Sequence, residues 1–270
     1  MKKIIAILPL LFICLHFSFG QCSSVIDSVY TPMGSAIAAK FDTCELNIDI
    51  RKAEDAFYKL NYNLTDYDPN NDNYDSEYII IVYDGVSTTG RFNCHGYAWI
   101  RTEQGIDRKI PVFDLPEEMA PFMNDGSYIE VFQPVFPAKV WWEGGAEAIH
   151  STITTEHPGY VISKWGGGPL CRHWWSNCPD SKGVIQRFFV KNCSCSDFEN
   201  ETVNLTNLTL SDDLIVRSCG DIHIENVTVP SGLSLTLYAR NGVNLDHSFI
   251  AEEGSTVSII IGDPYVISSP

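Results

Sequence analysis

Short apolar runs and alternating apolar and polar residues dominate the chain, and long helical patterns are rare. The continuous β-branched run at 78–83 predicts a buried strand. Residues 53–60 have the spacing of a short helix, and the polar stretch 61–76, dense in Asn, Asp and Tyr, predicts a surface loop. Similar apolar patterns predict further short strands at 131–132, 139–142, 148–155, 160–165 and 184–190. Residues 78–190 therefore indicate an α+β domain.

Two of these strands are separated by a strong turn signal, Glu156-His157-Pro158-Gly159. An antiparallel hairpin is the expected result. If Thr155 pairs with Tyr160 across the turn, Thr152 lies opposite Ser163. A slip of one residue would exchange the faces of Ser163 and its neighbour Lys164.

Residues 197–262 show a different pattern, with three similar passes at a period of about 19 to 22 residues. Each pass has two short strands with a polar corner between them, and then a second corner and a third strand. A repeated unit that cannot bury its apolar side alone suggests a small β-solenoid of three coils. An ordinary β-sandwich is the alternative, since it also shows short alternating strands. The first corners are Thr206-Asn207, Glu225-Asn226 and Asp246-His247.

The stretch Phe249-Ile250-Ala251-Glu252-Glu253-Gly254-Ser255 is similar to a turn in short C-terminal repeats of many secreted proteins from Bacteroidetes-type bacteria. This resemblance covers about sixty residues. It implies that the C-terminal region is a stalk or spacer.

The first twenty residues have the layout of a secretory signal peptide. Lys2 and Lys3 precede the apolar run 4–19, and Gly20 marks the expected cleavage point. A transmembrane anchor is the alternative, but about 16 apolar residues fall short of the roughly 20 that a span prefers. We therefore expect a bacterial protein that is secreted or held at the cell surface and has no membrane span.

The net charge and the cysteine content limit the kinds of ligand and partner that we expect. A net charge of −16 argues against nucleic acid, which requires a basic surface. Nine cysteines are present, and Cys14 would leave with the signal peptide. The other eight predict disulfides in an oxidising compartment. Metal binding is the alternative, but no Cys-x-x-Cys pair occurs, so disulfides are favoured; we expect no cofactor. The plausible bridges are Cys22–Cys44, Cys171–Cys178, and Cys219 with either Cys193 or Cys195.

Cys94 is the candidate for covalent chemistry. Asn93 is a favourable N-cap residue, so Cys94 would occupy the first turn of a helix, where a thiolate is stabilised. A thiol nucleophile needs a base and a group that orients the base. His150 is the expected base, and Ser163 would lie one diagonal step away on the same face. His95 is expected to be structural.

These residues occur in three motifs: Asn-Cys-His-Gly-Tyr-Ala-Trp at 93–99, His-Ser-Thr-Ile at 150–153, and a third motif from Ile162-Ser163-Lys164-Trp165-Gly166 to His173. Together they resemble, over about residues 78–190, the papain-like, NlpC-type superfamily of cysteine amidohydrolases. The resemblance implies an α+β domain over 21–192, with an N-terminal extension at 21–77, in which a helix carrying the cysteine packs on an antiparallel sheet.

Carried over, the resemblance makes Cys94 the nucleophile and His150 the base. Ser163 occupies the place of the orienting residue, where that superfamily has His, Asn, Asp or Gln. Lys164 or His173 is therefore an alternative partner. The backbone N–H of Cys94 would contribute to an oxyanion hole.

The resulting hypothesis is a secreted cysteine hydrolase that cleaves amide bonds in peptides or cell-wall peptides. A disulfide at Cys94 would exclude it. The alternative is a non-catalytic surface-binding or adhesion protein. The tryptophans at 141, 142, 165, 174 and 175 would then be either core residues or a surface that stacks on a cell-surface glycan.

Overall fold

The computed structural model describes residues 23–43, 47–66, 79–82, 88–110, 115–144, 148–165, 168–177, 185–194, 198 and 200–262. Strands make up 47% of these residues, and the helices are short. The predicted signal peptide at 1–20 lies outside the described residues. Within them, no helix is both long enough and apolar enough to cross a bilayer.

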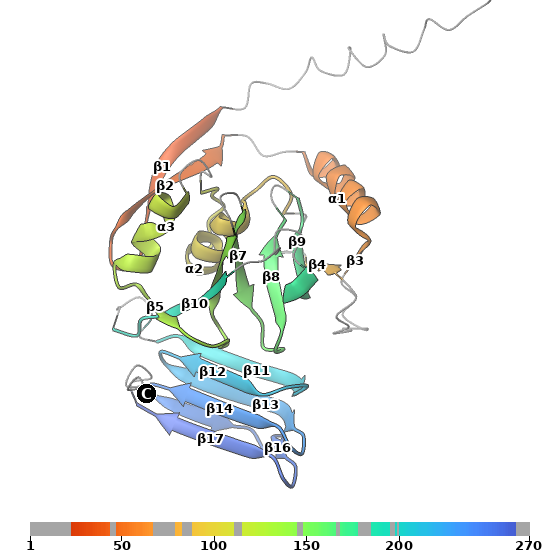
Figure 1. Cartoon of the computed structure of the whole chain (residues 1–270), viewed down its shortest axis with the longest axis vertical. Helices are drawn as coiled ribbons and strands as arrows, with labels where there is room; N and C mark the ends of the chain where they lie inside the picture. The colour runs from red at the N-terminus through yellow and green to blue at the C-terminus, as the bar shows by residue number, and fades with distance from the viewer. Residues whose placement is uncertain are drawn as a thin grey trace, which may run out of the picture.

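An eight-stranded sheet forms the centre of the larger part of the molecule (Figure 1). Its strand order is β3-β4-β9-β8-β7-β6-β10-β5, and all neighbours are antiparallel except β3 and β4. The strands are β3 (Leu64–Asp66), β4 (Ile79–Ile81), β5 (Tyr128–Val131), β6 (Lys139–Gly144), β7 (Ala148–Thr154), β8 (Tyr160–Lys164), β9 (Leu170–Trp174) and β10 (Ile185–Lys191).

The hairpin of β7 and β8 has the predicted register. Thr152 pairs with Ser163, and the Thr155 N–H donates to the Tyr160 carbonyl at 3.2 Å. Gly159 allows this turn because its φ is +81°, and a Cβ there would lie 2.1 Å from the Trp174 ring. The turn sequence therefore fixes which side chains share a face of the sheet.

Helices cover the sheet from different sides. The predicted helix at 53–60 is confirmed but longer: α1 spans Ile48–Tyr62, starts after the side-chain cap of Asn47, and ends at Asn63 in the left-handed region. A two-stranded ribbon precedes it. The other elements here are β1 (Ser24–Tyr30), β2 (Ala36–Asp42), the π-helix η2 (Gly96–Arg101), α2 (Thr102–Gln104), α3 (Leu115–Asn124) and the 3₁₀ turn η3 (Trp175–Asn177).

The two faces of the sheet carry different side chains. On one face Trp141 packs with Trp99 of η2 and Phe122 of α3 in the largest apolar cluster. On the opposite face Trp142 packs with Phe188. We refer to them as the Trp141 face and the Trp142 face.

The C-terminal residues form two further sheets, in which all strands are parallel. One is β11-β13-β15, with β16 also paired to β13, and the other is β12-β14-β17. Figure 1 shows them below the eight-stranded sheet. The strands are β11 (Thr202–Thr209), β12 (Leu214–Ser218), β13 (Asp221–Val229), β14 (Ser234–Ala239), β15 (Gly242–Leu245), β16 (Ile250–Ala251) and β17 (Thr256–Ile261).

The polar corners recur as the sequence predicts. Asn207 and Asn226 both adopt the left-handed region, with φ of 55° and 53°, which asparagine tolerates better than most residues. The Asn226 side-chain amide donates to the Asn207 oxygen at 2.7 Å, so the corners of successive passes are bonded together.

The predicted fold class is wrong. An α+β papain-like domain needs a regular helix carrying Cys94, whereas the helical turn at Cys94 continues as the π-helix η2 and one turn of α2. The expected solenoid is also wrong, because the described strands form several separate sheets and none of these forms a solenoid. A repeat period specifies strands and corners, but it does not specify how the strands associate into sheets. Two sheets over one apolar core are closer to the sandwich alternative, although the strands are parallel.

The inner positions of the C-terminal sheets give a stability prediction. Leu237 of β14 is 0% exposed, and its register partner one pass later, Ile259 of β17, is 44% exposed. We expect Leu237→Ala to lower the free energy of unfolding by about 2–5 kcal/mol, since it leaves a cavity in the core. Ile259→Ala should cost clearly less. Urea unfolding of both variants checks this, and equal losses would contradict it.

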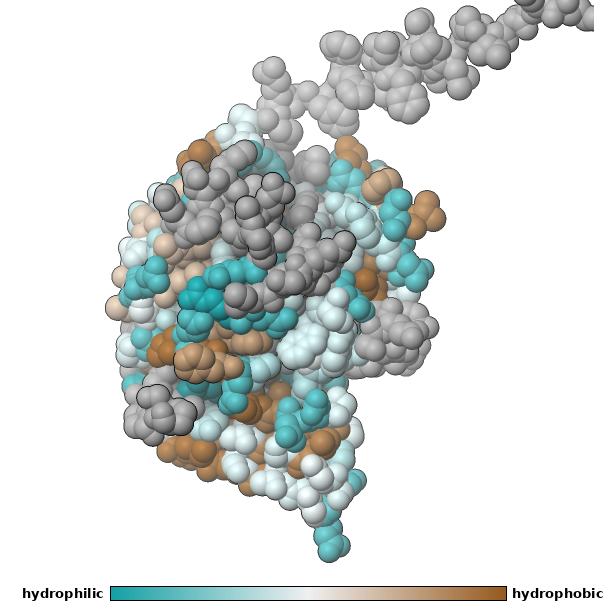
Figure 2. All heavy atoms as spheres, viewed as in Figure 1, coloured by the Kyte–Doolittle hydropathy of each residue, from teal (hydrophilic) through white to brown (hydrophobic). Residues whose placement is uncertain are grey.

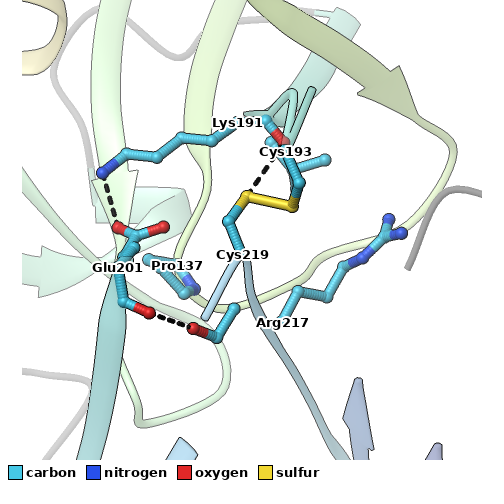
Figure 3. Close-up of a pocket in the computed structure, with 8 residues that line it drawn as sticks. Pro137, Lys191, Cys193, Glu201, Arg217 and Cys219 are labelled. Carbon is cyan, nitrogen blue, oxygen red and sulfur yellow. Dashed lines mark hydrogen bonds and ion pairs between the residues drawn. A yellow bond between two sulfur atoms is a disulfide. The ribbon is translucent and has the colours of Figure 1, made fainter. Parts of the chain in front are cut away.

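The two parts of the molecule are joined covalently and by backbone bonds. Cys193, after β10, forms a disulfide with Cys219, after β12. Phe136 pairs with β12: its N–H donates to the Ile215 carbonyl, and its carbonyl accepts from Arg217, both at 2.9 Å. Figure 3 shows the disulfide beside the Lys191–Glu201 ion pair at this junction.

Candidate functional site

The backbone around Cys94 is fixed by its neighbours. The Asn93 side-chain oxygen accepts from the Gly96 N–H at 2.9 Å and from the Ile110 N–H at 3.2 Å. Gly96 is required because a Cβ there would lie 1.8 Å from the Arg108 carbonyl oxygen. The Asn93-Cys94-His95-Gly96 sequence therefore holds Cys94 and His95 at the entry of the helical segment.

Cys94 keeps its thiol, and so does Cys171. The predicted Cys171–Cys178 bridge is therefore wrong. Cys219 pairs with Cys193 rather than with Cys195. Cys94 is 7% exposed and Cys171 is 0% exposed, so Cys94 is the more accessible thiol. The predicted Cys22–Cys44 bridge lies outside the described residues.

His95 is buried on the Trp141 face. Its Nδ1 lies 2.8 Å from the Ser151 hydroxyl, and its ring centroid is 5.4 Å from that of Trp141. The Trp99 indole N–H donates to the same hydroxyl at 3.0 Å. Ser151 therefore fixes both His95 and Trp99 against β7.

His150 lies on the other face of the sheet. It pairs with Trp142, whereas Ser151 pairs with Trp141, and successive side chains of a strand point to opposite faces. Cys94 belongs to the segment that packs against Ser151. The structure therefore does not bring the predicted nucleophile and the predicted base to the same face.

The other predicted residues gather on the Trp142 face. The Ser163 hydroxyl lies 2.8 Å from His173 Nε2, and His173 Nδ1 lies 2.9 Å from the Trp174 carbonyl oxygen. A carbonyl oxygen only accepts, so Nδ1 carries the proton and Nε2 accepts from Ser163. Ser163 thus orients His173. Cys171 pairs with Ser163 and belongs to the same face.

Burial keeps these imidazoles neutral. It lowers the pKa of His150 well below the ordinary 6.5, and the nearby His95 and His173 lower it further. Burial also lowers the pKa of His173 to about 4, although the Trp174 carbonyl opposes this. Both rings are therefore unprotonated at neutral pH, which is the form that can accept a proton.

Lys164, on the Trp141 face, is another buried residue with a shifted pKa. It is fully buried, with its Nζ 5.4 Å from the centroid of the Phe92 ring. Burial lowers the pKa of Lys164 to about 7, and the nearby Cys171 and Asp55 partly oppose this shift. The register set by the turn puts the Lys164 side chain on the face of the sheet opposite that of Ser163 and His150. Lys164 therefore does not orient His150.

The sequence did not indicate the roles of two residues of this site, Ser151 and His95, which are bonded to each other. The available signal was the alternation along β7, which separates His150 from Ser151. That signal does not say which face receives the helix, because both Ser151 and Thr152 are buried.

The aromatic residues are mainly core. Trp141, Trp142 and Trp165 are buried, whereas Trp174 and Trp175 are half-buried, with ring centroids 6.0 Å apart. Among the described residues, no group of three His, Cys, Asp or Glu side chains is arranged to hold a metal ion.

Comparison of the chain with protein families, with curated proteins and with solved structures finds no match.

The Ser151 contacts give a second stability prediction. Ser151→Ala removes the partner of His95 Nδ1 and of the Trp99 N–H, and both groups are buried. We expect a loss of about 1–3 kcal/mol in the free energy of unfolding. Differential scanning calorimetry would measure it. Ser151→Cys, which keeps a weak hydrogen-bonding group, should lose less, and an unchanged melting temperature for Ser151→Ala would contradict the assignment.

Proposed function

We propose that this protein is an exported cysteine hydrolase that cleaves amide bonds, with Cys94 as its nucleophile. The observation that carries the proposal is a retained, slightly exposed thiol that directly precedes, in the same helical turn, a histidine held by Ser151. A thiol nucleophile requires an adjacent base that is itself held in place. The Cys193–Cys219 disulfide and the predicted signal peptide support export.

The base in this proposal is His95 rather than His150. His95 lies on the same face of the sheet as the Cys94 segment, whereas His150 points to the other face. His95 takes the thiol proton, and the thiolate sulfur bonds to the amide carbonyl carbon. The carbon–nitrogen bond breaks as the imidazolium returns the proton to the amine. Water then hydrolyses the thioester and restores the thiol.

Peptides and cell-wall peptides are the substrates we propose, since both present amide bonds to an exported enzyme. A second candidate function is a non-catalytic surface-binding protein. The separation of Cys94 and His150 onto opposite faces favours it, because the predicted nucleophile and the predicted base do not meet.

Thiol mapping tests the proposal. The folded protein is treated with iodoacetamide over a range of pH, and modified peptides are identified by mass spectrometry. We expect Cys94 to react faster than Cys171, with a reaction rate that persists below the ordinary thiol pKa of about 8.5 because His95 removes the proton. His95→Gln should move the rate back toward that of an ordinary thiol. Equal, slow alkylation of both cysteines would favour the binding protein.

A further inference from the structure

The last strand of the C-terminal sheets, β17, exposes apolar side chains whose partners in β14 are buried. Leu237 and Ala239 of β14 are both 0% exposed. Their register partners in β17 are Ile259 and Ile261, which are 44% and 52% exposed. Each inner position is covered by the following pass, and no described strand follows β17. Figure 2 shows hydrophobic side chains at the lower end of the molecule, over these C-terminal strands.

The backbone of β17 is also open on one side. Thr256 and Gly262 donate their N–H groups to Leu233 and Ala239 of the neighbouring pass, both at 3.0 Å. Strand alternation therefore directs the N–H groups of Val257, Ile259 and Ile261 away from β14. Exposed edge strands are usually protected by charged residues or proline. β17, with the sequence Thr-Val-Ser-Ile-Ile-Ile, has neither.

We propose that this open end is the interface through which two copies of the chain associate, with β17 of one copy paired antiparallel to β17 of the other. At the opposite end of the C-terminal sheets, the edge of β12 is already occupied. There, Phe136 bonds to Ile215 and Arg217 of β12, and the Cys193–Cys219 disulfide holds the junction. Head-to-tail stacking of β17 on β12 is therefore blocked.

The contact between two open ends uses the same surface on both copies and closes after two. An uncharged edge with outward N–H and C=O groups is complementary to a second copy of itself. Pairing would complete the backbone bonds of both strands and cover Ile259 and Ile261 of both copies. A dimer, not a filament, is the product.

Salt should strengthen the association, because the two copies carry net charges of the same sign. The full sequence has a net charge of −16, removal of the signal peptide takes away only the positive Lys2 and Lys3, and the corners next to the interface carry Asp246, Glu252 and Glu253. Two copies therefore repel one another at low salt, while the interface itself is apolar. Screening should strengthen the dimer, which is the opposite of the response of an interface held by ion pairs.

Sedimentation velocity of the mature chain, over a range of concentrations at low salt and at about 0.5 M salt, tests the proposal. We expect a reversible dimer that is tighter at high salt. Ile259→Lys should weaken it at least about tenfold. Ile26→Lys is the matched control, because Ile26 is also an exposed strand isoleucine, 70% exposed, but lies in β1 of the larger part of the molecule. It should dimerise like the wild type. A wild-type monomer under all conditions, or equal behaviour of the two variants, would overturn the proposal.

Hydrogen exchange of the wild type gives a test that does not depend on a variant folding. The amides of Val257, Ile259 and Ile261 should become protected as the protein concentration rises. Those of Ser258 and Ile260, which face β14, should be protected at all concentrations. Outward amides that exchange at the same rate at every concentration would overturn the proposal.

Discussion

Cys94→Ala should abolish the amide hydrolysis that we propose, with a loss on the order of 10³-fold or more, because the proposed thioester forms on the Cys94 sulfur. Release of amines from a peptide mixture and from purified cell-wall peptidoglycan measures it. Cys171→Ala is the matched control. Cys171 is also a buried thiol, but it lies on the Trp142 face beside Ser163 and is 0% exposed. Its loss should leave turnover near that of the wild type.

The base is tested by two histidine variants in the same assay. His95→Gln should lower kcat by about 10² to 10⁴-fold, the usual contribution of a general base. His150→Gln should change kcat little, since its ring leaves β7 on the other face. A large loss for His150→Gln with none for His95→Gln would reverse this assignment. No hydrolysis by the wild type of either substrate would support the binding protein instead.

Local chemistry made the hairpin predictable. The turn at 156–159 brings Thr155 to Tyr160, and the remaining pairs of β7 and β8, including Thr152 with Ser163, follow from that one contact. The helix α1 was also predicted, although its cap at Asn47 places its start earlier than the apolar spacing suggested. Both features depend on residues close together in the sequence.

The side of the sheet that receives the Cys94 segment could not be predicted in this way. A strand that is apolar on one face and polar on the other would reveal its buried side. β7 instead buries Ser151 on one face and His150 with Thr152 on the other, because both faces are covered. The expected pairing of Cys94 with His150 assumed a face that the local pattern does not determine.

The C-terminal region shows the same limit. Its period predicted the strands and the asparagine corners, since Asn207 and Asn226 are suited to the left-handed turn. The division of the strands into two parallel sheets depends on contacts between passes, and the period alone does not specify it. Likewise, the choice of Cys193 over Cys195 as the partner of Cys219 depends on tertiary proximity.

A chain of four charges joins the two parts of the molecule and was not predicted at all. Glu103 of α2 contacts Lys139 of β6 at 2.5 Å and Lys191 of β10 at 3.0 Å, and Lys191 also contacts Glu201 at 2.5 Å. Figure 3 shows the Lys191–Glu201 end of this chain. The Lys139 side chain is only 6% exposed, and that of Glu103 is 11% exposed. These residues come from four separate segments, so no local pattern connects them.

Glu103→Gln should therefore lower the free energy of unfolding by about 3–5 kcal/mol, because it leaves the buried Lys139 ammonium without its carboxylate. Glu130→Gln is the control. Glu130 pairs with Arg187 at 2.7 Å, but its side chain is 41% exposed, so the cost should be about 0–1 kcal/mol. Urea unfolding at neutral pH measures both variants. Similar losses would show that burial does not decide the strength of these pairs.

The same carboxylate gives the pair a specific dependence on pH. Burial alone would raise the pKa of Glu103, but Lys139 and Lys191 outweigh this, and the net shift is downward from the ordinary 4.5. A lowered pKa in the folded state means that the carboxylate adds stability above its unfolded pKa, and that this stability is lost as the pH falls through the folded pKa. The wild type should therefore lose more stability than Glu103→Gln when urea unfolding is repeated from neutral pH into this acidic range. If the stability of the two proteins fell equally with pH, Lys139 and Lys191 would not be what keeps the Glu103 carboxylate ionised.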